Sequence, residues 1–366
     1  METQGNRTGA SSLSSAAILE TLLGLGTEEL CHLAEKEGQP AYRGKQIADW
    51  VYRRGARHFD DMVNIPSELR IRLGTTHRVG RSEILATQKA SDGTFKLLLG
   101  LEDGATMETV GLPYSDRFSC CVSTQVGCTL GCLFCATGMS GFSRNLTSGE
   151  IVDQVLAVRE AAAASVQPAD LAGRVDHVTF MGMGEPLLNY GAVLEALHLL
   201  NHELGISARN LTLSTAGVVP GILMLAREKL QITLAVSLHA PNDELRWLLM
   251  PGMTRWPVTE LVAACREYVS LTGRRVTFEY CLIDGVNDRD PEAAQLAGLL
   301  RGLNCHVNLI PLNRVAAKGM KPSSPARIQA FRGVLSHSGI QVTQRKARGA
   351  GIDAACGQLR RRHSLP

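Results

Sequence analysis

Residues 118–336 alternate between short apolar, β-branched runs and amphipathic stretches, and this alternation constrains the fold more than any other feature. The runs that predict strands are Phe118–Ser123, His177–Gly182, Asn210–Ser214, Ile232–Ser237, Arg275–Ile283 and Cys305–Ile310. The stretches that predict helices are Ser148–Ala163, Ala192–Leu204, Ile222–Lys229, Thr259–Leu271, Glu292–Leu300 and Pro325–Ser336. Strand–helix units of this kind form a parallel sheet covered by helices. We therefore expect the α/β class and a partial (β/α)6 barrel, with a doubly wound open sheet as the alternative.

Unusual polar residues follow these predicted strands at their carboxyl ends. They are Gly184 and Glu185 after the second strand, Ser214 at the end of the third, Ser237, Leu238 and His239 at the end of the fourth, and Asn313 past the sixth. Any one of these clusters could be ordinary turn chemistry. In barrels of parallel strands, however, the carboxyl ends meet at one rim, and active sites are built there. We expect the functional site at this rim.

Cys128, Cys132 and Cys135 form a C-x3-C-x2-C run directly after the first predicted strand. Three thiolates at this spacing can hold three irons of a 4Fe–4S cluster, whereas four cysteines normally close such a cluster. Zinc is the alternative because it also takes thiolates, but a structural zinc site is a closed tetrahedron and no histidine follows at zinc-finger distance. An open iron at the rim could be chelated by an amine and a carboxylate, which is the arrangement expected for S-adenosylmethionine (SAM).

The distribution of charge is more informative than the net charge of +3. One basic zone contains Arg43, Lys45, Arg53, Arg54 and Arg57, and a second contains Arg345, Lys346, Arg348, Arg360, Arg361 and Arg362. Two such zones suit a polyanion held at a defined place. Solvated helix faces and a disordered tail explain either zone equally well when it is taken alone.

The 366 residues allow one large domain and a smaller one. We expect a disordered leader (1–15), a helical accessory domain whose basic zone suits a polyanion (16–92), a β-hairpin connection (93–115), the partial barrel (116–345) and a C-terminal segment with a basic tail (346–366). Helices are expected in the accessory domain at Ala17–Leu23, Thr27–Glu35, Gly44–Arg54 and Ser67–Leu73. The sequence contains no membrane-spanning run and no signal-peptide pattern. Ten cysteines without an export signal indicate a reducing compartment, so we expect a cytoplasmic protein.

Several separated motifs resemble a known family. The segment Cys128–Cys135 resembles the radical SAM motif, and Cys121–Cys128, Met181–Asn189, Ser237–Asp243 and Arg348–Leu359 resemble the RlmN branch of the RlmN/Cfr RNA methyltransferases. The resemblance runs from roughly Ala41 to Leu359. It implies a radical SAM partial barrel with one 4Fe–4S cluster held by Cys128, Cys132 and Cys135. It also implies two SAM molecules per turnover, with SAM contacts from Gly184, Glu185, Ser214, Ser237, Leu238, His239 and Asn313.

The resemblance further implies catalytic roles for three residues. Cys356 is expected to receive a methyl group from one SAM, and a radical from a second SAM then converts this methyl to a methylene that adds to C2 of adenine. Cys121 is expected to release the adduct and to end in a disulfide with Cys356, while Glu108 is the expected proton acceptor. By composition alone, Cys356 would be a core cysteine or a loose thiol. Cys120 is interpreted as structural, because alternation along a strand turns it away from the face of Cys121.

The implied substrates are an adenosine of 23S ribosomal RNA and the adenosine beside the tRNA anticodon. The implied protein partner is an electron donor such as flavodoxin or ferredoxin. The resemblance implies no association with a membrane, and we expect a monomer. A Cfr-type enzyme that methylates C8 is the closest alternative, although Pro186–Asn189 and Ala240–Asp243 favour the C2 branch. A non-catalytic iron–sulfur RNA-binding protein or redox sensor is a further alternative, but it has no use for Cys356 or Glu185.

Overall fold

The computed structural model describes residues 19–163, 173–313, 319–345, 348–355 and 357–359. Its main element is a ten-stranded sheet with the order β14-β13-β12-β11-β10-β9-β6-β5-β4-β3. The strands β6 (Phe118–Cys121), β9 (His177–Phe180), β10 (Leu211–Thr215), β11 (Thr233–Ser237), β12 (Val276–Leu282), β13 (Cys305–Pro311) and β14 (Gln341–Gln344) run parallel. An antiparallel extension consists of β3 (Glu83–Lys89), β4 (Phe95–Gly100) and β5 (Thr106–Pro113).

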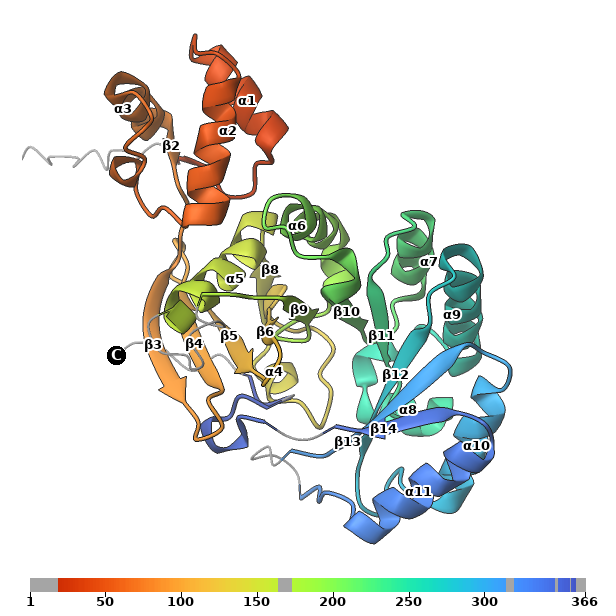
Figure 1. Cartoon of the computed structure of the whole chain (residues 1–366). Helices are drawn as coiled ribbons and strands as arrows, with labels where there is room; N and C mark the ends of the chain where they lie inside the picture. Colours follow the sequence, from red (N-terminus) through yellow and green to blue (C-terminus); the bar gives the residue numbers. More distant parts are fainter. Residues whose placement is uncertain (1–18, 164–172, 314–318, 346–347, 356, 360–366) are drawn as a thin grey trace, which may run out of the picture.

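Helices cover the outer side of the parallel strands (Figure 1). They are α5 (Ser148–Ala163), α6 (Tyr190–His202), α7 (Val219–Arg227), α9 (Val258–Thr272), α10 (Asp290–Leu300) and α11 (Pro325–His337). Helix α5 begins where its sequence predicts, since the Thr147 hydroxyl accepts the Glu150 N–H and the Glu150 carboxylate accepts the Thr147 N–H. The predicted α/β class is confirmed, and each predicted strand and helix of the barrel overlaps an observed one.

Three regions away from the site differ from the sequence-based expectations. Strand β14 adds a further parallel strand after α11, and its polar sequence QVTQ carries no apolar run that would have revealed it. Strand β3 lies inside the range expected to be helical, because it is an exposed edge strand with little apolar alternation. Within Ala17–Leu23, residues Glu20–Thr21 form the short strand β1, which pairs with β2 (His77–Arg78) rather than starting a helix.

The N-terminal helices form a separate group at one end of the molecule (Figure 1). The group contains α1 (Thr27–Lys36), α2 (Tyr42–Ala48), the π-helix η1 (Asp49–Arg54) that continues α2, and α3 (Ser67–Thr76). Leu30, Ile47 and Val51 are fully buried in its core. None of the helices in the described ranges has the length and apolar character required to cross a membrane.

An ion pair between Arg81 and Asp153 joins this helical group to α5. Both side chains are buried, with 2% and 0% exposed. Asp153 also accepts the Ser82 N–H at 2.6 Å, and Arg81 donates to the Gly55 carbonyl at 2.8 Å. A buried ion pair therefore holds the junction, and both of its side chains make further hydrogen bonds to the backbone.

Replacing Arg81 with methionine should lower the free energy of unfolding by about 3–5 kcal/mol, because Asp153 would remain buried without its partner. Urea denaturation followed by circular dichroism measures this change. Arg57→Met is the matched control, since the Arg57–Glu160 pair is partly exposed and should cost no more than about 1 kcal/mol. Equal losses in the two variants would contradict the prediction.

Candidate active site

A cavity opens at the carboxyl ends of the parallel strands, at the rim where the sequence predicts the site. Its lining includes most of the predicted site residues, namely Cys121, Cys128, Cys132, Cys135, Gly184, Glu185, Ser214, Ser237, His239 and Asn313. Leu238 does not line the cavity because it is fully buried in the main hydrophobic core. Glu108 is also absent from the lining, and Cys356 lies outside the described residues.

The cysteine triplet occupies the loop from β7 (Gln125–Gly127) to the short helix α4 (Ala136–Met139). Helix α8 (Asp243–Leu249), which the sequence did not predict, and the turn after it form the wall behind this loop. The Leu133 N–H donates to the Leu249 carbonyl at 2.9 Å, and the Gly252 N–H donates to the Leu130 carbonyl at 3.0 Å. A Cβ at Gly252 would lie 2.6 Å from the Leu130 Cα, so the two segments pack backbone to backbone.

The three thiols are partly buried, and burial raises the pKa of Cys128 to about 11 and also raises the pKa of Cys132. A metal must therefore drive their deprotonation on binding. In the described part of the chain, no three His, Cys, Asp or Glu side chains converge as ligands of a single ion. A structural zinc ion takes four ligands in a closed tetrahedron, and a 4Fe–4S cluster takes one thiolate at each of three separate irons.

The environment of Arg246 on α8 shows whether an iron–sulfur cluster is compatible with the wall behind the cysteine loop. Its side chain is fully buried, and its Nε and Nη1 have no hydrogen-bond partner among the described residues. A buried cation with unpaired donors is unfavourable unless an anion lies nearby. A cluster carrying three thiolates is such an anion, so the residues of this wall fit the group.

Glu185 fastens the end of β9 to the end of β10. Its carboxylate accepts the Thr215 hydroxyl at 2.7 Å, the Ala216 N–H at 2.6 Å and the Leu187 N–H at 3.0 Å. Burial raises the pKa of this carboxyl group, and these donors oppose the shift. Because three donors already occupy the carboxylate, little acceptor capacity is left for the amine of SAM. The contacts of Glu185 support a role in positioning the loop at residues 215–217.

Gly184, just before Glu185, has a positive φ of 99°. A Cβ at this position would lie 2.6 Å from the Cβ of Gln125 and 2.8 Å from its backbone nitrogen. Only glycine allows the chain after β9 to pass this close to the strand β7 that leads into the cysteine loop.

His239 is held as a neutral imidazole against the cysteine loop. Its Nδ1 accepts the Cys281 N–H at 2.9 Å, which leaves the ring proton on Nε2. Burial lowers the pKa of His239 to about 3. The ring packs edge-on against the ring of Phe134, with 4.7 Å between ring centroids. In the sequence, Phe134 lies between Cys132 and Cys135. His239 can therefore offer the cavity an N–H donor without a charge.

Cys120 and Cys121 lie on opposite faces of β6, as strand alternation predicts. Cys120 is fully buried in the main core, and its Sγ lies 3.7 Å from the Thr109 hydroxyl. Cys121 lines the cavity and packs in a small apolar cluster with Val110 and Ala354. The environments of the two thiols agree with a structural Cys120 and a site-facing Cys121.

Glu108 forms a buried ion pair with Lys96 on the neighbouring strand β4, at 3.0 Å. Each of the two side chains is 4% exposed. The Lys96 ammonium also donates to the Asp353 carbonyl at 3.3 Å, and Asp353 has a positive φ of 50°. Lys96 therefore connects the carboxylate to the C-terminal segment that precedes position 356.

The C-terminal segment is fastened to the cysteine loop on the other side of position 356. The Ala136 N–H donates to the Gly357 carbonyl at 2.7 Å, and the Thr137 hydroxyl donates to the Leu359 carbonyl at 2.6 Å. Ala355 and Gly357 both line the cavity. The described residues on either side of position 356 thus lie at the site.

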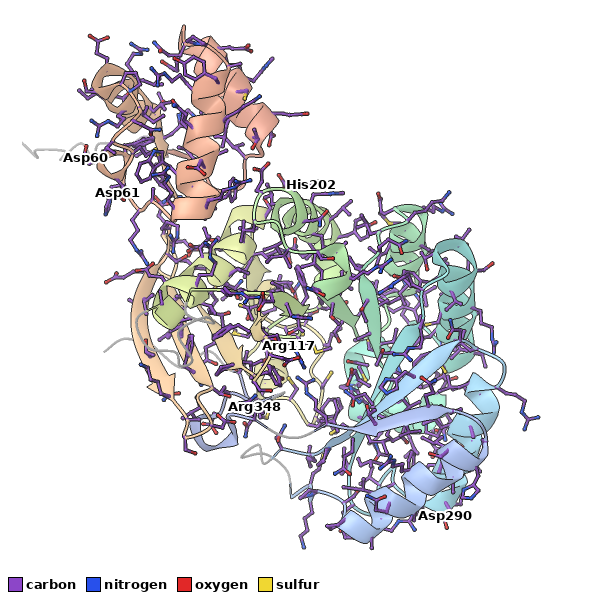
Figure 2. All side chains as sticks on the ribbon, in the orientation of Figure 1. Asp60, Asp61, Arg117, His202, Asp290 and Arg348 are labelled. Atoms are coloured by element: carbon purple, nitrogen blue, oxygen red, sulfur yellow. The ribbon has the colours of Figure 1, made fainter. Side chains whose placement is uncertain are left out.

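Sequence reasoning did not select Tyr114, Arg117 or Glu279, and it named Arg348 only in a basic zone and in the C-terminal motif. Tyr114, Arg348 and Glu279 line the cavity, and Arg117 and Arg348 stack on the Tyr114 ring at 4.3 and 4.6 Å from its centroid. Figure 2 shows the two arginines close together and far from the N-terminal helices. Glu279 could have been found from the sequence, because it places a carboxylate inside a predicted strand that is otherwise expected to be buried.

The basic zone of the N-terminal helices is partly committed to internal contacts. Arg54 pairs with Asp49 at 2.7 Å, Arg57 pairs with Glu160 at 2.8 Å, and Arg43 donates to Gln46 at 2.7 Å. Lys45 and Arg53 are exposed. The positive charge that this face offers to a polyanion is smaller than the residue count suggests.

Comparison with known proteins gives consistent matches over nearly the whole chain. Residues 122–297 match the model of the Radical SAM superfamily, and residues 21–79 match that of the ribosomal RNA large subunit methyltransferase N-terminal domain. A protein of Thermosynechococcus vestitus named "Probable dual-specificity RNA methyltransferase RlmN" is 48% identical over 93% of this chain and 98% of its own length. A relative with the same name in Trichormus variabilis is 50% identical over 94% of both chains. The chain belongs to the RlmN family.

A solved structure supports this membership. The crystal structure of a radical SAM methyltransferase from Sphaerobacter thermophilus has a TM-score of 0.88 and 48% identity, covering 93% of this chain and 99% of that chain. The predicted radical SAM fold and RlmN branch are therefore confirmed. As a radical SAM enzyme of the RlmN family, the protein uses a 4Fe–4S cluster and SAM.

Proposed function

We propose that the protein is a dual-specificity RNA methyltransferase that methylates C2 of an adenosine in 23S ribosomal RNA and of the adenosine beside the tRNA anticodon. The observation that carries the proposal is one cavity lined by the cysteine triplet, by Cys121 and by the residues that flank position 356. A non-catalytic iron–sulfur protein has no need for a further thiol, that of Cys121, in the same cavity as the three cysteines of the cluster loop. RlmN-named relatives over more than nine-tenths of the chain support the same reading.

We propose the following division of roles. Cys128, Cys132 and Cys135 hold the cluster, and Gly184, Ser214, Ser237, His239 and Asn313 line the space for SAM, with Leu238 supporting this wall from the core. Glu185 contributes by fixing the loop at residues 215–217. When bound, the cluster and SAM supply a 5′-deoxyadenosyl radical, a species able to remove hydrogen from a methyl group.

The reaction itself requires a carrier, because C2 of adenine has no acidic proton and resists plain nucleophilic methylation. The Cys356 sulfur takes a methyl group from SAM by displacement, loses one hydrogen from that methyl to the radical, and bonds through the resulting methylene to C2. The adduct then gives up the C2 proton to Glu108, once the base displaces part of the pairing of Glu108 with Lys96, and gives up its unpaired electron to the oxidised electron carrier. The Cys121 thiolate then attacks the Cys356 sulfur and the carbon–sulfur bond breaks. The released methylene takes up a proton to become the methyl group of the free base, and a Cys121–Cys356 disulfide is left for an external reductant.

The RNA must present an unstacked adenine to this cavity. We propose that the N-terminal helices (residues 19–82 of the described chain) and the stacked group of Arg117, Tyr114 and Arg348 hold its backbone. A flavodoxin or ferredoxin would supply the electron to a monomeric enzyme. We propose a cytoplasmic location, because ribosomal RNA and tRNA are found there.

An anaerobic assay with SAM and separate 23S and tRNA fragments tests the proposal. Mass mapping should find 2-methyladenosine at one position in each fragment, and a fragment with guanosine at that position is the control. Formation of 8-methyladenosine would indicate a Cfr-type enzyme instead. Failure of the reconstituted protein to cleave SAM would favour a non-catalytic iron–sulfur protein or redox sensor.

A further inference from the structure

Arg246 is the largest of the fully buried side chains, yet most of its guanidinium is unused. Its Nη2 donates to the Ala216 carbonyl, and its Nε and Nη1 have no partner among the described residues. Leaving charged donors unpaired in a protein interior costs several kcal/mol. A residue that only braced the Ala216 carbonyl would not need a positive charge.

The position of Arg246 is set by helix α8. The Asn242 side chain caps the start of this helix by accepting the Leu245 N–H at 3.0 Å. The far end of the helix contacts the cysteine loop through the Leu249 carbonyl and the Leu133 N–H. The surrounding side chains are apolar, since Leu249, Met250 and Leu130 form a buried cluster against which Cys128 and Cys132 pack.

A peptide group links the Glu185 carboxylate to Arg246. The Ala216 N–H donates to Glu185 Oε2 at 2.6 Å, while the carbonyl of the same residue accepts from Arg246. Burial lowers the pKa of Arg246 to about 10, and a negative charge on the Cys132 sulfur opposes this shift more than Asp243 or Glu185 does. A bound cluster would keep that sulfur as a thiolate, so the cysteine loop would then supply the main negative charge near Arg246.

We propose that Arg246 is the fixed counter-charge of the three-cysteine cluster and makes the cluster easier to reduce. Reduction adds one electron from a one-electron donor, such as a reduced flavoprotein or, in vitro, dithionite, to a site that three thiolates already make negative. A guanidinium keeps its charge throughout, so no proton moves and no bond breaks in this step. In an apolar, water-poor wall this fixed charge favours the added electron strongly. Arg246 is a positioning and electrostatic residue that does not line the cavity.

The proposal rests on Cys128, Cys132 and Cys135 being the cluster ligands, and its test needs no RNA. Cluster-loaded wild type, R246K, R246Q and R246M are titrated anaerobically at set potentials, and the reduced cluster is counted by electron paramagnetic resonance. At a fixed potential the ratio of reduced to oxidised cluster should fall about tenfold or more in R246Q and R246M, equivalent to 59 mV for one electron. R246K should keep most of the wild-type ratio. The control R332M removes the same charge from an exposed position of α11 and should change nothing.

A wild-type ratio in R246M or R246Q, with full iron and sulfide content, would overturn the proposal. If R246M fails to fold or to hold iron, R246Q against R246K decides, because both retain a donor for the Ala216 carbonyl and differ in charge. Equal ratios in that pair would overturn the proposal, and a lower ratio in R246Q would support it. A lower ratio in R246Q and R246M, together with no RNA methylation by the wild type, would support the role of Arg246 and count against the proposed function.

Discussion

Cys356→Ala should abolish methyl transfer to RNA while SAM cleavage to 5′-deoxyadenosine continues. The cleavage site would be intact, because the cysteine loop and the strand ends are built without position 356. The sulfur that carries the methyl group would be missing, and SAM cannot methylate C2 of adenine directly. Radiolabelled methyl incorporation into RNA and chromatography of 5′-deoxyadenosine measure the two halves separately. Full methyl transfer by this variant would refute the two-cysteine mechanism.

The neighbouring pair Cys120 and Cys121 provides a matched control within one strand. Cys121→Ala should trap a covalent complex of protein and RNA, because the thiol that opens the Cys356 sulfur bond is gone. Cys120→Ala should turn over normally, since this thiol faces the core and Thr109 rather than the cavity. A gel shift that survives denaturation reports the trapped complex. Trapping by Cys120→Ala instead would reverse the assignment of the two thiols.

The sequence was sufficient to predict the rim and the parallel strands of the described chain other than β14. Strand ends are marked by a change from β-branched residues to polar turns, and this change depends only on local sequence. Because carboxyl ends of parallel strands meet at one edge, Glu185, Ser214 and His239 could be brought together without a structure. The side chain of Leu238 lies in the core between Ser237 and His239, so the contact of this residue with SAM stays a prediction for its backbone.

The features that escaped prediction depend on contacts between distant parts of the chain. Arg348 stacks on Tyr114 across more than two hundred residues of sequence, and Lys96 reaches Asp353 in the same way. Helix α8 is seven residues long, too short for a periodic pattern to show, so the burial of Arg246 could not be seen. These residues gain their roles from packing and not from any local motif.

Replacing any one of Cys128, Cys132 or Cys135 with alanine should remove the iron–sulfur cluster and reduce SAM cleavage to background. A 4Fe–4S cluster that already has one iron without a protein ligand would be left with two such irons exposed to solvent and chelators. Iron and sulfide analysis, with thiolate-to-iron absorbance, should show loss of the cluster after anaerobic reconstitution. The folded state should persist, because these thiols are partly exposed and lie in a loop at the rim.

The matched control is Cys305→Ala, which removes a buried thiol from the amino end of β13, at the opposite edge of the barrel from the rim. This variant should keep its cluster and its SAM cleavage, so that loss in the triplet variants cannot be assigned to cysteine removal in general. A triplet variant that still binds iron and cleaves SAM would refute the ligand assignment. Zinc in place of iron in the wild-type protein, with no gain of cleavage on iron reconstitution, would do so equally, because a closed zinc site has no position left for SAM.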